Sequence, residues 1–380
     1  MDLNEMRERI NNIDDQLAEL FVQRMGIAAQ IAGYKRSNNV PVFSAGRERE
    51  ILTRVTGKTG PELEMYAKVL FNTIFDISKS YQLRLLSGQS KLLANIKEAL
   101  EKTPREFPNK AVVACQGVEG AFSQQACDRL FPLADIFYFS RFEGVFKAVS
   151  KGMCQYGILP IENSSAGSVT EVYDLMEKYR FHIVRSVRLK IEQCLLAPKG
   201  TELKHIKEVF SHEQAISQCS EYLKKFPDIK ITFIENTAAA ARMIAQSGRS
   251  DVAAISSLNC AQLYELNVLD RNIQNSDHNY TRFICISRDL EIYPGADHLS
   301  LMLTVPHTPG SLYQLIAKIA TRGLNLEKLE SRPIPGKDFE FRFYVDIGAS
   351  IYSEDVLSLI SQLENDLDSF TFLGAYGETG

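Results

Sequence analysis

The sequence lacks several features that would place it in a class at once. No apolar run approaches the roughly 20 residues needed to cross a membrane, and the seven cysteines are scattered, with no C-x-x-C pair. No basic block stands out, and the formal net charge is −4. The N-terminal stretch MDLNEMRERI mixes acids and bases and is not a secretory signal. We expect a cytoplasmic protein with reduced thiols that binds no metal, nucleic acid or membrane.

The composition is that of an ordinary soluble globular protein, with 45% hydrophobic and 24% charged residues. A chain of 380 residues is too long for one simple core, so two or three domains are expected. Two prolines among charged residues mark KTPREFPNK (102–110) as a linker. We expect an all-helical domain (1–88), a linker (89–109), an α/β domain (110–289) and a smaller α+β domain (295–380).

Residues 2–87 contain no convincing strand, and two breaks interrupt their helical pattern. The breaks are GYKRSNNVP (33–41) and TGKTGPE (56–62), and Pro61 and Glu62 suit the first turn of a helix. This part of the chain therefore predicts a long helix, a short helix and a second long helix.

Two cations interrupt the apolar stripe of the first predicted helix. Arg24 and Lys35 lie eleven residues apart, which places them only ~20° apart around the helix axis and about 16 Å apart along it. A cation buried without an anion is costly, and Glu48 and Asp76 are candidate internal partners. Because cations outnumber the acids on these surfaces, the pattern favours a pocket for a small anionic molecule over a simple buried salt bridge.

Arg7 cannot reach the same pocket on a straight helix. It lies seventeen residues before Arg24, about 25 Å away along the axis and ~100° off the shared face. Arg7 is therefore either a surface residue or part of the equivalent pocket of a second subunit in a symmetric dimer. On the third helix, Ser78 and Gln82 form one polar face that is able to meet a ligand.

The pattern MRERINNIDDQLAELFVQR, followed by Lys35 and PVFSAGRERE, resembles the all-helical chorismate mutase family across residues 1–87. In that family an intertwined dimer rearranges chorismate to prephenate. The resemblance implies that one subunit contributes six catalytic residues to a pocket: Arg24, Lys35, Arg47, Glu48, Ser78 and Gln82. It implies that Arg7 is donated by the partner chain. Ser44, expected to contact the substrate, stands where the family usually has Asp.

A pericyclic rearrangement needs no acid, base or nucleophile, and this agrees with a pocket of cations. It needs a dicarboxylate held in a compact conformer, with positive charge near the ether oxygen as negative charge develops there. The resemblance implies that Lys35 and Gln82 flank this oxygen, that the arginines hold carboxylates and that Glu48 takes the hydroxyl.

The middle of the chain changes character after residue 110. Short apolar runs rich in β-formers are each followed by a helical pattern, as in AVVACQG before FSQQACDRL and ITFIEN before TAAAARMIAQ. This alternation predicts an α/β sheet with parallel strands. Polar residues gather at the predicted strand ends, where such sheets bind ligands and free N–H groups favour anions, although each residue also fits a plain helix cap. HNYTRFICI (278–286) differs, because Thr281 and Arg282 begin an apolar strand that needs no cap.

The segments GVEGAFSQQA, YGILPIENSSAGSV, HEQAISQC, ENTAAAA and NYTRF together resemble prephenate dehydratase over the whole middle part. The resemblance implies two lobes like those of a periplasmic binding protein, with the active site in the cleft between them. Thr281 matches the central catalytic group of the family. The other catalytic residues expected in the cleft are Glu162, Asn163 and Gln218. The residues expected to bind substrate there are Ser123, Ser164, Ser211, Arg282 and Phe283.

Prephenate loses carbon dioxide and a ring hydroxyl together, and aromatisation drives the reaction. A Thr281 hydroxyl hydrogen-bonded to the leaving oxygen would assist this loss. We take Glu162 as the proton source, with its pKa raised by a closed apolar cleft.

Residues 299–380 predict a strand, a helix, two strands, a helix and a last strand, which is the ferredoxin-like βαββαβ arrangement. HTPGSLYQ and GLNLEKLESRP resemble the ACT domain of the same enzymes, which binds phenylalanine at a subunit interface and inhibits the dehydratase. The implied effector residues are Gly310, Ser311, Leu312, Asn325, Leu326 and Ser331. A dimerisation domain that binds nothing is the alternative.

The whole chain thus resembles bifunctional chorismate mutase–prephenate dehydratases with an ACT regulatory domain. The implied partners are chorismate, prephenate, the effector L-phenylalanine and a second copy in a homodimer or higher oligomer, with no cofactor. Three other interpretations stay open. In the first, because of Ser44, the dehydratase is active but the helical domain is catalytically weak or regulatory. In the second, the protein is a non-catalytic amino-acid sensor that uses the cleft as a binding site. In the third, the dehydratase prefers arogenate.

Overall fold

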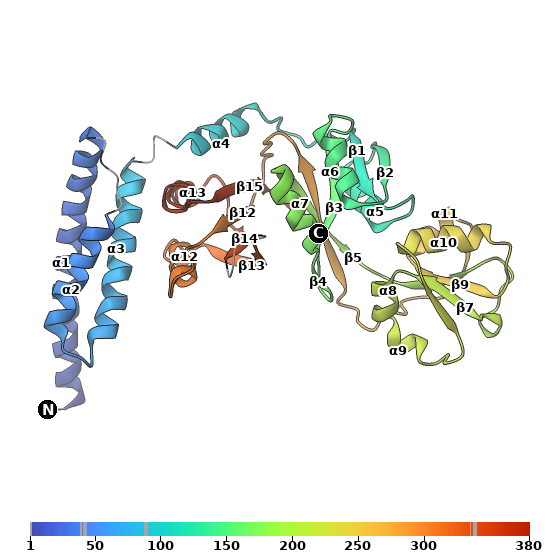
Figure 1. The fold of residues 1–380 in the computed structure, drawn as a ribbon, viewed down its shortest axis with the longest axis horizontal. Coiled ribbons are helices and arrows are strands. Elements are labelled where there is room, and N and C mark those ends of the chain that lie inside the picture. Colours follow the sequence, from blue (N-terminus) through green and yellow to red (C-terminus); the bar gives the residue numbers. More distant parts are fainter. Residues whose placement is uncertain (1, 39, 41–43, 87–89, 335, 337–339) are drawn as a thin grey trace. The chain divides into compact units, whose positions relative to one another are not determined.

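Figure 1 presents the computed structural model of the chain, which divides into two compact units. The first unit comprises residues 1–98 and 301–372, and the second comprises residues 99–300 and 373–380. The structure describes residues 2–38, 40, 44–86, 90–334, 336 and 340–380.

The N-terminal part of the first unit is helical, with a long, a short and a long helix, as predicted. They are α1 (Leu3–Asn38), α2 (Ala45–Thr59) and α3 (Glu64–Leu86), and they lie side by side (Figure 1). α1 continues past Gly33, where the sequence predicted a break, because one glycine inside a helix costs only about 1 kcal/mol relative to alanine. Within the described parts of the chain, no helix is long and apolar enough to span a bilayer.

Much of the apolar stripe of α1 is not covered by the described residues of this single chain. α1 buries only Ala28 and Ala32 among its described residues. Leu17 and Leu20, which belong to the stripe shared with Arg24, are 55% and 60% exposed. An apolar stripe of this kind is typical of a helix face that packs against another surface.

The C-terminal part of the first unit follows the predicted order of strands and helices. Its elements are β12 (His298–Thr304), α12 (Ser311–Ala320), β13 (Asn325–Pro333), β14 (Phe341–Gly348), α13 (Glu354–Asp366) and β15 (Phe370–Tyr376). The four strands form one sheet in the order β13-β14-β12-β15, so β13 and β15 are its edges.

The second unit contains two sheets, and the end of helix α4 (Lys91–Lys102) precedes them in the chain. The elements of the first lobe are β1 (Val112–Gln116), α5 (Phe122–Leu130), β2 (Asp135–Phe139), α6 (Phe142–Ser150), β3 (Tyr156–Asn163), β4 (Gly167–Ser168), α7 (Thr170–Tyr179), β5 (His182–Lys190), β11 (Tyr280–Ser287) and β16 (Glu378–Thr379). Those of the second lobe are β6 (Cys194–Ala197), η1 (Leu203–His205), β7 (Glu208–Ser211), α8 (Glu213–Gln218), α9 (Ser220–Leu223), β8 (Lys230–Phe233), α10 (Thr237–Gln246), β9 (Val252–Ser256), α11 (Leu258–Leu263) and β10 (Asn267–Asp270).

The sheets contain parallel strands, as predicted, but they also contain antiparallel ones, which the sequence did not predict. In the first lobe the order is β16-β5-β11-β3-β1-β2, with β4 on β3, and in the second it is β10-β6-β9-β7-β8. β1 runs parallel to β2 and β3, whereas β11 runs antiparallel to both β3 and β5. The chain leaves the first lobe after β5 and returns through β11, so β11 arrives in the opposite direction.

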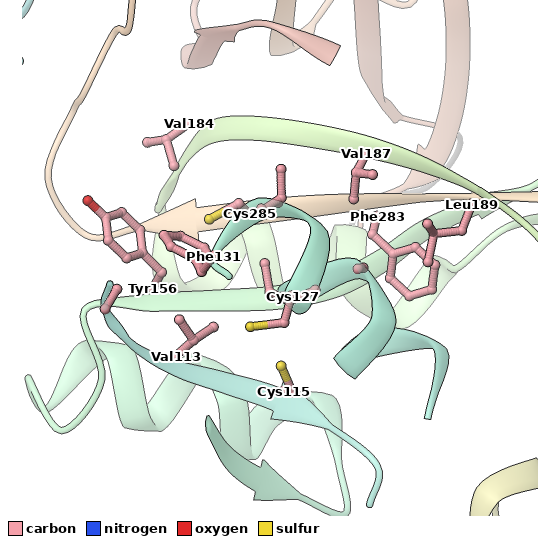
Figure 2. Packing of buried hydrophobic residues seen from close by; sticks show 14 of the residues in the cluster. Val113, Cys115, Cys127, Phe131, Tyr156, Val184, Val187, Leu189, Phe283 and Cys285 are labelled. Atoms are coloured by element: carbon pink, nitrogen blue, oxygen red, sulfur yellow. The ribbon is translucent and has the colours of Figure 1, made fainter. Parts of the chain in front are cut away.

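A buried apolar cluster fixes β11 against helix α5 (Figure 2). Phe283 and Cys285 of β11 pack with Cys127 and Phe131, which lie on and just after α5, and with Val187 of β5. All seven cysteines of the chain are buried and free, as the sequence predicted. The strand that carries Thr281 is therefore anchored in a buried apolar core of this lobe.

Candidate active sites

The cation on the inner face of α1 lacks an acidic partner within the described chain. Arg24 donates a hydrogen bond from Nη1 to Oγ of Ser78 on α3, and its guanidinium lies 5.8 Å from the centre of the Phe75 ring. No carboxylate among the described residues forms a salt bridge with Arg24. Burial lowers the pKa of Arg24. This site holds a positive charge, partly withdrawn from water, that an anionic ligand would satisfy.

The acid at the start of α2 lies between two lysines. Nζ of Lys79, on α3, is 3.3 Å from Oε1 of Glu48 and 3.0 Å from Oδ1 of Asp76. Burial lowers the pKa of Lys35 on α1, and the Glu48 carboxylate opposes that shift. Ser44 caps α2 through its backbone only, since its C=O accepts from the Glu48 N–H at 3.2 Å and its side chain makes no capping bond. The acids expected as partners of Arg24 and Lys35 thus both bind Lys79, a residue for which the sequence predicted no role.

The other expected residues of this pocket differ in their surroundings. Ser78 and Gln82 are buried on one face of α3, and Oε1 of Gln82 has no hydrogen-bond partner in the described chain. Arg47 is exposed and pairs with Glu50 at 2.6 Å, and Arg7 is exposed near the start of α1. The single chain buries Ser78 and Gln82, leaves Arg24, Lys35 and Glu48 partly buried, and leaves Arg7 and Arg47 exposed.

A cleft of about 490 Å³ lies between the two lobes of the second unit. No lysine or arginine lines it among the described residues. Instead the first residues of α5, α6 and α7 from one lobe, and of α8 and α10 from the other, face it. Unpaired N–H groups and the helix dipole favour anions at such ends. The cleft is therefore suited to a carboxylate without providing a cationic side chain.

Asn163, at the end of β3, organises the base of the cleft. Its Oδ1 accepts from the N–H groups of Ser165 and Ala166 at 3.0 and 2.9 Å, which fixes the orientation of the amide. Its Nδ2 then donates to Oγ1 of Thr281 at 2.9 Å and to Oδ1 of Asn279 at 2.8 Å. Because Oγ1 of Thr281 accepts this bond, the hydroxyl proton is left to donate into the cleft.

Asn279 extends this network to the second lobe. It is 2% exposed, and its Nδ2 donates to Oε1 of Gln218 on α8 at 3.1 Å. With its oxygen occupied, Gln218 is left with its NH₂ group for a ligand. Asn279 lies within HNYTRFICI, a segment whose sequence predicted roles for Thr281, Arg282 and Phe283 only. Its position could have indicated a role in the cleft, because Asn279 is an amide residue two positions before Thr281 and therefore lies on the same side of an extended segment.

The comparison with known proteins agrees with both predicted activities. The prephenate dehydratase family model matches residues 113–291, and the chorismate mutase type II model matches residues 6–83. A bifunctional chorismate mutase/prephenate dehydratase from Enterobacter agglomerans is 31% identical over 379 residues, which cover 98% of this chain and 95% of that protein. The chain belongs to the bifunctional chorismate mutase/prephenate dehydratase family. It is an isomerase and a lyase of phenylalanine biosynthesis that converts chorismate to prephenate and prephenate to phenylpyruvate.

Two further proteins resemble part of this bifunctional enzyme. Arogenate dehydratase 2 from Petunia hybrida is 33% identical over 327 residues, covering 79% of this chain and 82% of that protein. The solved structure of prephenate dehydratase from Arthrobacter aurescens in complex with L-Phe matches with a TM-score of 0.64 and 28% identity, covering 70% of this chain and 89% of that chain.

Two residues expected in the dehydratase cleft lie on the other face of the sheet. Asn163 pairs in register with Thr281, and Glu162 pairs with Arg282. Since neighbouring residues of a strand point to opposite faces, Glu162 and Arg282 are directed away from the cleft, and neither lines it. They face each other instead, with Arg282 Nη2 3.5 Å from Glu162 Oε2. Because Glu162 does not line the cleft, this placement does not support its expected role as the proton source there.

Of the three serines expected in the cleft, one lines it and two do not. Ser123, at the start of α5, lines the cleft. Gln218 and Phe283 line it as well. Ser211 is fully buried and donates to the backbone oxygen of Ile255 at 2.7 Å. Ser164 donates to the backbone oxygen of His278 at 2.9 Å. Ser164 and Ser211 do not line the cleft and hold the backbone around it instead.

The expected effector residues lie around the start of α12 and along β13. Gly310 adopts φ 87 just before α12, a conformation that favours glycine. Ser311 and Leu312 line a hollow of about 360 Å³ with Phe341 and Phe343. Three expected residues lie on the edge strand β13 and do not line this hollow: Asn325, Leu326 and Ser331.

Proposed function

We propose that the helical pocket catalyses the mutase step by charge placement alone, without proton transfer. Arg24 holds a substrate carboxylate, and Glu48 accepts a hydrogen bond from the substrate hydroxyl. Lys35 and Gln82 face the ether oxygen as negative charge develops there. One observation supports these roles: Arg24 lacks an acidic partner in the described chain. A carboxylate of the substrate would supply that partner.

The mutase pocket is completed by a second copy of the chain, which donates Arg7. On a continuous helix Arg7 lies about 25 Å from Arg24, too far to serve the same pocket. The exposed apolar stripe of α1 supports an intertwined dimer, since a partner helix would cover it. Arg47 turns from Glu50 to the substrate when the dimer encloses the ligand.

In the dehydratase cleft, Thr281 assists the departure of the ring hydroxyl. The bond from the ring to its carboxylate breaks and releases carbon dioxide. The electron pair enters the ring, and the C–O bond opposite breaks. The oxygen leaves as hydroxide, hydrogen-bonded by the Thr281 hydroxyl, and takes one proton to become water. The network from Asn163 is the observation that carries this assignment, because it leaves the Thr281 proton free to donate.

The remaining carboxylate of prephenate is held by Gln218 and the helix N-termini. The proton donor for the leaving hydroxide belongs to the titratable groups that line the cleft, which among the described residues are Glu171, His212 and Glu235. Glu162 instead holds Arg282 behind the strand, a structural role.

The C-terminal part, from residue 295, acts as a ferredoxin-like ACT domain that binds L-phenylalanine and lowers dehydratase activity. The order of its elements and the hollow beside Ser311 and Leu312 support this role. The Arthrobacter aurescens relative, solved with L-Phe, supports the choice of effector. In a dimer, the exposed edge strand β13 would bring Asn325, Leu326 and Ser331 to a shared effector site.

The test is steady-state conversion of chorismate and of prephenate, each with and without L-phenylalanine. Lys35→Ala should abolish mutase activity and leave dehydratase activity nearly intact, whereas Thr281→Ala should do the reverse. Near-normal turnover of prephenate by Thr281→Ala would overturn the cleft assignment. Equal loss of both activities in Lys35→Ala would mean that the residue holds the fold.

A second candidate function keeps the dehydratase and makes the helical part catalytically weak or regulatory. Ser44 favours it, because a serine stands at a position expected to contact the substrate. Chorismate consumption by the full chain separates the two candidates. Arogenate offered beside prephenate tests the substrate choice that the petunia relative raises.

A further inference from the structure

One cation of the helical bundle has no role in the mechanism above. Lys79 lies on α3 next to Ser78 and contacts two acids, Glu48 at the start of α2 and Asp76 on its own helix. The Lys79 side chain is 16% exposed, and those of Glu48 and Asp76 are 27% and 17% exposed. This is a half-buried cluster and differs from the exposed pairs of the helix surfaces.

We propose that Lys79 is a positioning residue of the mutase pocket, which holds the Glu48 carboxylate from α3 and offsets its charge so that a dianion can bind beside it. The proposal rests on the role proposed above for Glu48. It adds a residue that acts through Glu48 and does not touch the substrate itself.

The first argument is geometric. Asp76 and Lys79 are three residues apart on one helix face, so Asp76 directs the long lysine side chain toward α2. The ammonium then reaches Oε1 of Glu48 at 3.3 Å. Glu48 follows the irregular start of α2, whose capping residue Ser44 makes no side-chain bond. Lys79 therefore supplies a side-chain anchor that the cap does not.

The second argument is electrostatic. Burial alone would lower the pKa of Lys79, but Asp76 and Glu48 outweigh burial, and the pKa is raised. Lys79 is thus an ammonium ion at neutral pH. Lys35 interacts with the same Glu48 from α1. A carboxylate close to two ammonium ions can accept a hydrogen bond from the substrate hydroxyl without repelling the two carboxylates of chorismate as strongly as an isolated carboxylate would.

The experiment uses the full-length enzyme and compares Lys79→Met with Lys79→Arg. Lys68→Met is the matched control, because Lys68 lies on the same helix in an i, i+4 pair with Glu64 that is about half exposed. Mutase kcat and KM are measured for each variant. Prephenate turnover reports whether the rest of the chain is intact, and thermal unfolding reports the stability of the bundle.

Lys79→Met should raise the KM for chorismate about tenfold and change kcat by less than about threefold, since loss of an anchor used throughout binding acts mainly on KM. Lys79→Arg should restore most of the loss, and Lys68→Met should behave as the parent. The double variant Lys79→Met/Glu48→Gln should be no worse than Glu48→Gln alone, because Lys79 acts through Glu48.

Three results would overturn the proposal: an unchanged KM in Lys79→Met, a Lys79→Arg variant as impaired as Lys79→Met, or additive losses in the double variant. If Lys79→Met lowers the unfolding temperature sharply, Asp76→Asn is used in its place. This variant removes the charge that holds Lys79, and Asn has nearly the same size as Asp. Asp76→Asn should raise KM less than Lys79→Met, and no rise overturns the proposal. Normal mutase kinetics in Glu48→Gln would instead overturn the role of Glu48 in the proposed function.

Discussion

The candidate ligand-binding groups of the helical bundle are cationic side chains on long helices, whereas the dehydratase cleft is lined by helix N-termini, amides and hydroxyls. Arg24 meets a serine and a ring face in place of a carboxylate. In the cleft, Asn163 and Asn279 already satisfy one another and hold Thr281 and Gln218. Both sites take dicarboxylates, so the substrate alone does not explain the difference.

The two reactions explain it. In the rearrangement, negative charge develops at an ether oxygen, and nearby cations stabilise the transition state more than the ground state. In the dehydratase step, one carboxylate must leave as neutral carbon dioxide. A cation bound to that carboxylate would stabilise the ground state and slow its loss. A cleft without lysine or arginine among its described lining residues suits the second reaction.

The largest effect should come from removing the unmatched cation. Arg24→Ala should lower mutase kcat/KM by about 10³-fold, because a carboxylate of the substrate would then be desolvated without a partner. Dehydratase kcat/KM should stay within about twofold of the parent, since the residues of the cleft remain in place. Arg36→Ala, an exposed arginine on the same helix, is the control. A loss of less than tenfold in Arg24→Ala would contradict the cation-based account of the bundle.

The next largest effect should come from the amide network of the cleft. Asn163→Asp keeps the oxygen that accepts from the loop but replaces the donor to Thr281 with a second acceptor. The Thr281 hydroxyl would then donate to the new carboxylate and no longer to the substrate. We expect dehydratase kcat to fall about 10²-fold, with mutase kinetics unchanged. Stopped-flow or steady-state assays on prephenate decide this, and retention of most of the activity would show that the network does not orient Thr281.

A smaller effect should follow from ionic strength. Interactions with partly exposed cations weaken as salt is added, whereas hydrogen bonds from backbone amides depend less on it. Between about 0.05 and 0.5 M salt, we expect the mutase KM to rise several-fold and the dehydratase KM to rise less. Potassium chloride and potassium acetate should give the same trend if screening is the cause. A steeper rise for the dehydratase would reverse the comparison.

The smallest effect should come from Glu162→Gln. Because Glu162 faces Arg282 on the far side of the sheet, its replacement should change dehydratase kcat by less than about threefold. Glu171→Gln and Glu235→Gln, which alter residues that line the cleft, are the comparison. A loss of 10²-fold in Glu162→Gln alone would restore the role first expected from the sequence.

The secondary structure of the chain was largely predictable, because local patterns dominate it. The periodic apolar residues of α1 and α3 and the β-rich runs before α5 and α10 all formed the expected elements. The sequence did not predict the antiparallel direction of β11, since nothing local records that the chain leaves one lobe and returns from another. The predicted domain boundaries remain predictions.

The candidate sites were predictable to a lesser degree. Thr281 and Asn163 were singled out and do face the cleft, but so was Glu162, which precedes Asn163 and must point the other way. Strand alternation was available from the sequence, whereas the face that borders the cleft was not. Lys79 escaped notice because its partner Glu48 lies on another helix.

The sequence by itself determined the kinds of groups that each region contains: a stripe of cations on one helix, and amides and hydroxyls at strand ends. These follow from the order of residues and the fixed periods of helices and strands. Only the tertiary structure decided which group meets which, so that Glu48 binds Lys79 and Asn163 holds Thr281. Such pairings join residues far apart in the chain, and they depend on strand register and helix packing that no local pattern encodes.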